Sequence, residues 1–260
     1  MSSVKIPKIL KLKDYITLIG TTVGILALIC AALGGRAIIS LGFFLLSISQ
    51  GTDMVDGYIA RKTNTVNEMG KELDSLSDSL TFGIAPAILT FQAFKTGTLF
   101  DIVLIIGSIC FALGAILRLA RFNLSGIKGY TGLPTPISAL LMITFFYANY
   151  FYAVAIEGNS SFSPFFSLLP ISSYIVVFFM ILIGWFNITS YINFNERDKT
   201  IYIGFFILAP LSPLFGIIGL SNPTFAVSIA CSIFFLVSFF IFLIFIIRGF
   251  FNIQKVEKKS

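Results

Sequence analysis

The sequence predicts an all-α integral membrane protein with about eight transmembrane helices and both termini in the cytoplasm. Two features of composition predict this class, because 57% of the 260 residues are hydrophobic and only 12% are charged. Such a chain has too few polar residues to cover a water-soluble domain. The third observation is that the apolar residues form runs of about 20, the length that spans a bilayer as a helix.

Eight apolar runs reach this length. They cover residues 15–33, 37–60, 70–94, 98–122, 132–156, 166–190, 200–219 and 223–248. Pro210 and Pro213 interrupt the seventh run, and a loop rich in Ser, Phe and Pro precedes the sixth. Any count between six and eight is therefore consistent with the pattern.

The basic residues predict the orientation, because cytoplasmic loops of membrane proteins are enriched in Lys and Arg. With a cytoplasmic N-terminus, all 18 basic residues except Arg36 and Lys95 lie on the cytoplasmic side. We expect a multi-pass protein of the cell membrane whose active site opens to the cytoplasm. The net charge of +6 has the same origin, so we expect no nucleic-acid partner.

Four aspartates lie within the second and third runs, where a charge is costly and marks a functional site. They are Asp53, Asp56, Asp74 and Asp78. Residues three or four positions apart share a helix face, so each helix presents one pair. The short connection between the runs makes them antiparallel neighbours. All four carboxylates are then expected at one depth, about 10 Å inside the cytoplasmic boundary.

Four carboxylates at one depth require compensating positive charge. An all-oxygen ligand set suits Mg²⁺, Mn²⁺ or Ca²⁺, and two divalent cations would balance the site. A paired-metal site can stabilise both the attacking and the leaving oxygen of a phosphoryl transfer. The alternative is that the acids pair with Arg61, Lys62 and Lys71, which lie nearer the loop. Histidine is absent, which excludes an imidazole base.

Residues beside the aspartates suit a phosphorylated ligand. Gly57 has no side chain, so a nucleotide can approach the helix closely, and Ala60 extends this groove of small residues. Arg61 at the helix end is placed to bind a phosphate, while Gly70 lets the next helix begin close to the first. A glycine in a membrane helix is also a common packing position, so this interpretation depends on its neighbours.

Together these positions resemble the signature of the CDP-alcohol phosphotransferase family: Asp53-x-x-Asp56-Gly57-x-x-Ala60-Arg61, eight further residues, and Gly70-x-x-x-Asp74-x-x-x-Asp78. The resemblance implies a six-helix catalytic core in which the four aspartates hold two divalent cations, Mg²⁺ or Mn²⁺. It also implies that the segment 57–61 receives the CDP moiety and that Asp78 acts as general base.

Two further stretches resemble those that mark the phosphatidylserine synthases of this family and their archaeal archaetidylserine counterparts. They are Leu117-Arg118-Leu119-Ala120-Arg121-Phe122-Asn123 and Gly132-Leu133-Pro134-Thr135-Pro136. The second continues with Ile137-Ser138-Ala139, where many relatives have Ala-Ala. Arg118 and Arg121 either bind an anionic acceptor, such as the carboxylate of serine, or only mark a cytoplasmic helix end. Asn187, near the cytoplasmic end of the sixth run, is the other polar candidate, and it either caps or packs.

The resemblance implies transfer of a phosphatidyl or archaetidyl group from CDP-diacylglycerol or CDP-archaeol to L-serine, with release of CMP, by a homodimer in the bilayer. The expected divisions are a basic juxtamembrane segment (1–14), the catalytic core (15–190), further C-terminal transmembrane helices (191–248) and a basic cytoplasmic tail (249–260). Glycerol 3-phosphate or an inositol phosphate is the alternative acceptor. A divalent-cation channel or transporter is the alternative class, since intramembrane acids also line ion paths.

Overall fold

The computed structural model describes residues 10–63, 68–124, 130–158, 171–191, 193–194, 213–219, 221 and 223–257. For residues 56–63, 68, 130–131, 193–194, 245 and 248–257 the description covers the backbone only. The helices are α2 (Leu12–Leu33), α3 (Arg36–Thr63), α4 (Glu68–Asp78), the π-helix η1 (Ser79–Ile84), α5 (Ala85–Phe94), α6 (Phe100–Leu124), α7 (Thr135–Glu157), α8 (Ser172–Ile188) and α10 (Phe225–Glu257). Residues 213–219 are also helical. The predicted helical class is confirmed.

Five of the described helices are long and apolar enough to cross a membrane: Leu12–Leu33, Arg36–Val55, Phe100–Leu124, Thr135–Glu157 and Phe225–Ile244. The apolar helix α8 has 17 residues. Most of the seventh predicted span, 200–219, lies outside the described residues. The protein is membrane-embedded, while the count of eight spans and the orientation stay predictions.

The third predicted span, 70–94, is one continuous rod made of three segments. The backbone stays in the right-handed helical region at Asp78 before η1 and at Ala85 after it, so α4, η1 and α5 run on without a break. A π-turn inserts one extra residue per turn and rotates the next segment of the helix about the axis, and such turns are frequent at functional sites. The sequence pattern did not predict this turn, which begins directly after Asp78.

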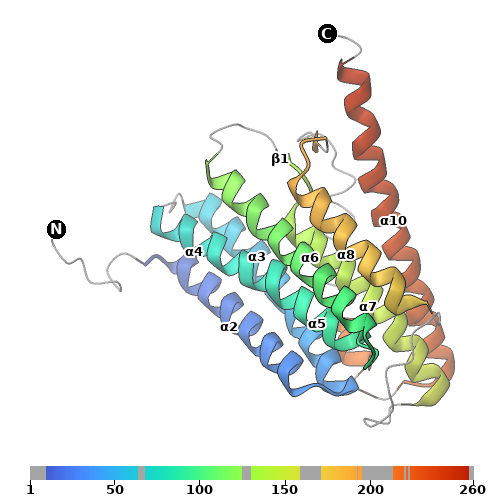
Figure 1. The fold of residues 1–260 in the computed structure, drawn as a ribbon. Helices are drawn as coiled ribbons and strands as arrows, with labels where there is room; N and C mark the ends of the chain where they lie inside the picture. Colours follow the sequence, from blue (N-terminus) through green and yellow to red (C-terminus); the bar gives the residue numbers. More distant parts are fainter. Residues whose placement is uncertain are drawn as a thin grey trace.

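Helix α7 is the central element of the bundle, and side chains on all its faces are buried. It packs against α10 through a group of aromatic rings, in which the ring centroids of Tyr147 and Phe235 lie 5.1 Å apart in a stacked arrangement. Figure 1 shows α10 at the edge of the bundle, extending past the other helices at the end where β1 lies. Helix α10 continues through Glu257, so most of the expected tail (249–260) is helical.

One end of α7 is fixed by a small polar structure. Residues Tyr130–Thr131 (β1) pair antiparallel with Asn193–Phe194 (β2), and the Leu133 N–H donates to Phe186 O at 3.0 Å. Gly132, between β1 and Leu133, has a φ of +84°, and a β-carbon there would overlap the backbone of Asn187. Only glycine fits this position, which holds the start of α7 against the end of α8.

The opposite end of α7 is fixed by a buried ion pair. Arg36, at the start of α3, is 3% exposed and lies 2.6 Å from the Glu157 carboxylate. Its guanidinium also donates to Gly158 O at 3.1 Å. The charge distribution had predicted an outer loop for this arginine. In the structure it ties two helices together at the bundle end farthest from the aspartates.

Candidate active site

Three of the four predicted aspartates meet in the structure. Asp53 from α3 and Asp74 and Asp78 from α4 each offer one carboxylate oxygen, and these oxygens lie within 4.8 Å of one another. All three side chains are half-buried. Oxygens this close, on acidic groups, fit the preference of a hard divalent cation for carboxylate ligands. The number and identity of the bound ions stay predictions.

The pocket that contains these carboxylates has a wall that the sequence did not predict. Helix α2 contributes Thr17 and Gly20, and α3 adds Ser49 and Thr52. A β-carbon at Gly20 would lie 2.5 Å from Thr52 Oγ1, so this glycine is what allows α2 to approach α3. The Thr21 hydroxyl donates to Ser77 Oγ at 2.7 Å and ties α2 to α4 as well. Helix α2 therefore holds both aspartate-bearing helices in place.

A buried ion pair lies at the start of α2, beside the aspartates. Lys13 is 8% exposed and its ammonium lies 3.6 Å from Asp14, which is fully buried. The second oxygen of Asp14 accepts a hydrogen bond from the Lys11 N–H at 2.7 Å, which caps the helix. Asp74 interacts electrostatically with both members of the pair. A lysine of the predicted basic juxtamembrane segment thus contributes positive charge near the acidic site.

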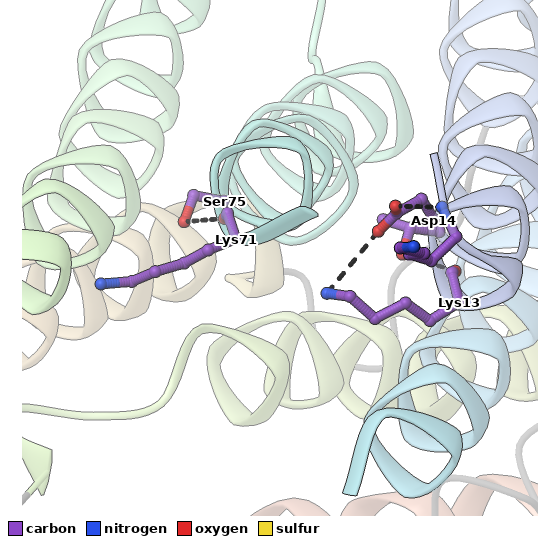
Figure 2. Close-up of polar contacts among 6 residues, drawn as sticks. Lys13, Asp14, Lys71 and Ser75 are labelled. Carbon is purple, nitrogen blue, oxygen red and sulfur yellow. Dashed lines mark hydrogen bonds and ion pairs between the residues drawn. The ribbon is translucent and has the colours of Figure 1, made fainter. Parts of the chain in front are cut away.

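Lys71, one of the cations considered as a partner of the acids, is exposed on α4. Figure 2 shows its side chain extending away from the Lys13 and Asp14 pair on α2. The neighbouring Ser75 hydroxyl donates to Lys71 O at 3.1 Å, a contact within the helix. The side chains of Arg61 and Lys62, the other two cations, lie outside the described part of the chain.

The remaining motif residues are placed only in part. Asp56, Gly57, Ala60 and Arg61 belong to the last turns of α3, where the description covers the backbone alone. Gly70 is buried in the first turn of α4, as a close approach of helices requires. Their predicted roles in holding a cation or a nucleotide stay predictions.

The two predicted acceptor arginines lie at the end of α6, beside the start of α7. Arg118 is 7% exposed and donates to Thr135 Oγ1 at 3.1 Å. Arg121 is half-buried and donates to Ile188 O, at the end of α8, at 2.7 Å. The segment 132–136, singled out in the sequence, therefore meets the arginine segment in space.

Two amide side chains lie in this region, of which Asn187 was predicted as a polar candidate and Gln50 was not. Gln50, on α3, is fully buried and its Nε2 donates to Pro136 O at 2.8 Å. Asn187, on α8, is fully buried and accepts a hydrogen bond from the Ser138 hydroxyl at 2.6 Å. The only signal for Gln50 is that it precedes Asp53 by three positions, which places both on one helix face.

Comparison with known proteins gives relatives that include serine phosphatidyltransferases and an archaetidylserine synthase. The chain is 40% identical over 140 residues to the CDP-diacylglycerol–serine O-phosphatidyltransferase of Methanocaldococcus jannaschii, a match covering 54% of this chain and 62% of that protein. It is 32% identical over 155 residues to the archaetidylserine synthase of Methanothermobacter thermautotrophicus, covering 58% and 64%. A CDP-diacylglycerol–serine O-phosphatidyltransferase of Bacillus subtilis is 35% identical over 115 residues, covering 42% and 62%.

The chain thus matches less than two thirds of the length of each of these relatives. The family comparison covers far more of it. The family model for the CDP-alcohol phosphatidyltransferase domain matches residues 10–247. This range includes the three converging aspartates, the arginines of α6 and the start of α7. By this match, and by the aspartates that meet in the structure, the chain belongs to the CDP-alcohol phosphatidyltransferase family.

Proposed function

We propose that the protein transfers a phosphatidyl or archaetidyl group from a CDP-linked lipid to the hydroxyl of L-serine and releases CMP. The observation that carries the proposal is the meeting of Asp53, Asp74 and Asp78 in a member of this family. The acceptor is suggested by the names of the relatives, which are serine phosphatidyltransferases and an archaetidylserine synthase. Family membership favours this transferase over the alternative of a cation transporter.

The proposed site uses its acidic residues in two ways. Asp53, Asp56, Asp74 and Asp78 would hold two divalent cations, Mg²⁺ or Mn²⁺, with Ca²⁺ as a further candidate. When bound, these ions supply positive charge that stabilises the diphosphate and the departing CMP. Gly57, Ala60 and Gly70 leave room for the CDP moiety, and Arg61 pairs with a phosphate.

Asp78 is the proposed general base. Its carboxylate takes the proton of the serine hydroxyl as the hydroxyl oxygen attacks the phosphorus on the lipid side of the diphosphate. The new phosphorus–oxygen bond forms while the bond to the CMP oxygen breaks, so CMP leaves with the electron pair. Arg118 and Arg121, in the proposed role, hold the carboxylate of serine and orient its hydroxyl toward Asp78.

The proposed setting is the cell membrane, with both termini and the mouth of the site on the cytoplasmic side. The distribution of Lys and Arg supports this orientation. A site near one membrane boundary lets the lipid tails remain in the bilayer while serine and CMP exchange with water. A homodimer and the four divisions of the chain, with a core at 15–190, belong to the same proposal.

The proposal is tested with purified protein in detergent or nanodiscs, by following CMP release. We expect CMP from CDP-diacylglycerol or CDP-archaeol only when both L-serine and Mg²⁺ or Mn²⁺ are present, and none after chelation with EDTA. Glycerol 3-phosphate and inositol phosphate serve as competing acceptors. Equal CMP release with those acceptors would contradict the assignment of serine as the acceptor. Metal flux into liposomes without CMP release would contradict the assignment as a transferase.

A further inference from the structure

The first turn of α7 is surrounded by polar side chains that are almost completely shielded from solvent. Thr135 and Ser138 come from α7 itself, Gln50 from α3, Arg118 from α6 and Asn187 from α8. None of these five is more than 7% exposed. Three hydrogen bonds described above attach Gln50, Arg118 and Asn187 to this turn. Four helices thus place polar groups at one location in the interior of a membrane protein.

Two atoms of this polar group have no hydrogen-bond partner among the described residues: Gln50 Oε1 and Asn187 Nδ2. Leaving a buried polar atom unpaired costs about 1–3 kcal/mol. One of these atoms can only accept a hydrogen bond and the other can only donate. Together they suit a ligand that carries both a donor and an acceptor.

The orientation of each amide follows from its paired side. Gln50 faces a carbonyl oxygen, Pro136 O, so the atom toward it must be the donor Nε2 and the unpaired atom must be Oε1. The Ser138 to Asn187 distance of 2.6 Å is typical of an O–H···O bond and short for N–H···O. The oxygen of Asn187 therefore faces Ser138, and the unpaired atom is Nδ2.

This location also adjoins the acidic site. Gln50 lies three residues before Asp53 on α3, so the two side chains are neighbours on one face. A small molecule bound beside Gln50 can place a hydroxyl near the aspartates. The Arg118 guanidinium and the start of a 23-residue helix both favour a negative group on the α7 side.

We propose that Gln50 and Asn187 distinguish an amino acid from other alcohols in the acceptor site. Gln50 Oε1 accepts a hydrogen bond from the ammonium group of the acceptor, and Asn187 Nδ2 donates one to its carboxylate beside Arg118. This inference rests on the proposed function, because it assigns the groups that select the acceptor at that same site.

The test removes one group at a time from the acceptor and one partner at a time from the protein. Ethanolamine lacks the carboxylate of serine, and 3-hydroxypropionate lacks its ammonium group. With the wild-type protein we expect kcat/KM for CMP release to be at least about tenfold lower with either analogue, since each loses a charge-assisted hydrogen bond. This comparison needs no variant and stands even if a variant does not fold.

The variants then show which residue recognises which group. Gln50→Met should lower kcat/KM for serine about tenfold or more but leave 3-hydroxypropionate unchanged, because that acceptor has no ammonium to lose a partner. Asn187→Asp retains the oxygen facing Ser138 and replaces the donor by an acceptor. It should lower the use of serine by a similar factor and leave ethanolamine unchanged or improved.

Gln92→Met is the matched control. Gln92 donates from Nε2 to a backbone oxygen, Ala31 O, at 2.8 Å, and its buried Oε1 has no hydrogen-bond partner in the part of the chain that the structure describes. It lies at the opposite end of the bundle. This variant should keep the wild-type order of acceptors. A drop in Gln50→Met that is equal for all three acceptors would overturn the inference in favour of a packing role.

Failure of the inference and failure of the proposed function are distinguishable. If the wild-type protein releases no CMP with serine, the proposed function is wrong and the inference falls with it. If it uses serine but accepts ethanolamine and 3-hydroxypropionate equally well, the function stands and the inference is wrong.

Discussion

Asp78 occupies a special place among the acids of this site. It is the last residue of α4, and the π-turn begins at the next position. Its carboxylate is close to those of Asp53 and Asp74 and lines the same pocket. A residue in this position can bind a cation together with its neighbours and also face an acceptor hydroxyl.

Asp78→Asn should separate these two roles. The amide retains an oxygen for a cation but cannot take a proton, so we expect transfer to fall by about 10²- to 10⁴-fold. Binding of the CDP-lipid, measured by equilibrium titration with Mg²⁺ present, should stay close to that of the wild type. Asp101→Asn, at the far end of the bundle, is the control and should keep its activity. Equal loss of binding and turnover in Asp78→Asn would argue against a base.

The Lys13 and Asp14 pair leads to a prediction about stability. Lys13→Met leaves the fully buried Asp14 without its cation, and breaking a buried pair in this way costs about 3–5 kcal/mol. The exposed Lys11, two positions earlier, offers the control Lys11→Met, which should change little. Thermal unfolding of both variants in the same detergent measures the difference. Equal melting temperatures for Lys13→Met and Lys11→Met would show that the ion pair does not stabilise the fold.

The aspartates could be predicted from the sequence because acids in an apolar run are conspicuous, and helical spacing then groups them. Lys13 and Gln50 could not be predicted as partners in the site, and Asn187 was predicted only as a polar candidate that caps or packs, for a physical reason. A lysine before an apolar run is usually a basic flank, and a single amide inside one is usually a packing residue. That these residues lie near the site follows only from the positions of α2, α7 and α8 relative to the aspartates. Spacing along a single helix does not predict those positions.

At the scale of elements, close helix contacts depend on glycines. Helices α6 and α8 meet at Gly114 and Gly184, whose backbones touch. This crossing brings the end of α6, with Arg118 and Arg121, next to Asn187. In a membrane the packing of small residues drives helix association, since lipid is as apolar as leucine.

Gly184→Ala tests this crossing. The added β-carbon would lie 2.5 Å from Cys110 O, so the two helices must move apart, at a cost of about 1–3 kcal/mol. Gly51→Ala is the matched control, because a β-carbon there has no neighbour within 4 Å in the described part of the chain and alanine is the better helix former. We expect a lower melting temperature for the first variant only. A similar fall in both would mean that the α6 and α8 contact is not specific.

Most helices could be predicted because a bilayer imposes both their length and their composition. The predicted run 37–60 became Arg36–Thr63, and the run 98–122 became Phe100–Leu124. The π-turn at 79–84 could not be predicted from helical spacing, and its contacts with α2, α6 and α7 join segments that are distant in the sequence. The β1 and β2 pair depends on residues that are more than 60 positions apart.

At the scale of the whole molecule, the two ends of the bundle differ in character. The end with the aspartates contains Lys11, Lys13, Lys71, Arg118 and Arg121 among the described residues. The other end contains Arg36, paired with Glu157, and Lys95. Basic residues are retained on the cytoplasmic side during insertion, so this asymmetry predicts which end faces the cytoplasm.

Two exposed lysines at opposite ends make the orientation measurable. Lys11 precedes α2 and Lys95 follows α5, and both side chains are exposed. In a background with Cys30, Cys110 and Cys231 replaced by alanine, Lys95→Cys should react with a membrane-impermeant maleimide in intact cells. Lys11→Cys should react only after permeabilisation, because the N-terminal end of α2 is expected in the cytoplasm. The reverse labelling pattern would place the aspartates toward the outer face and would rule out a site that exchanges serine and CMP with the cytoplasm.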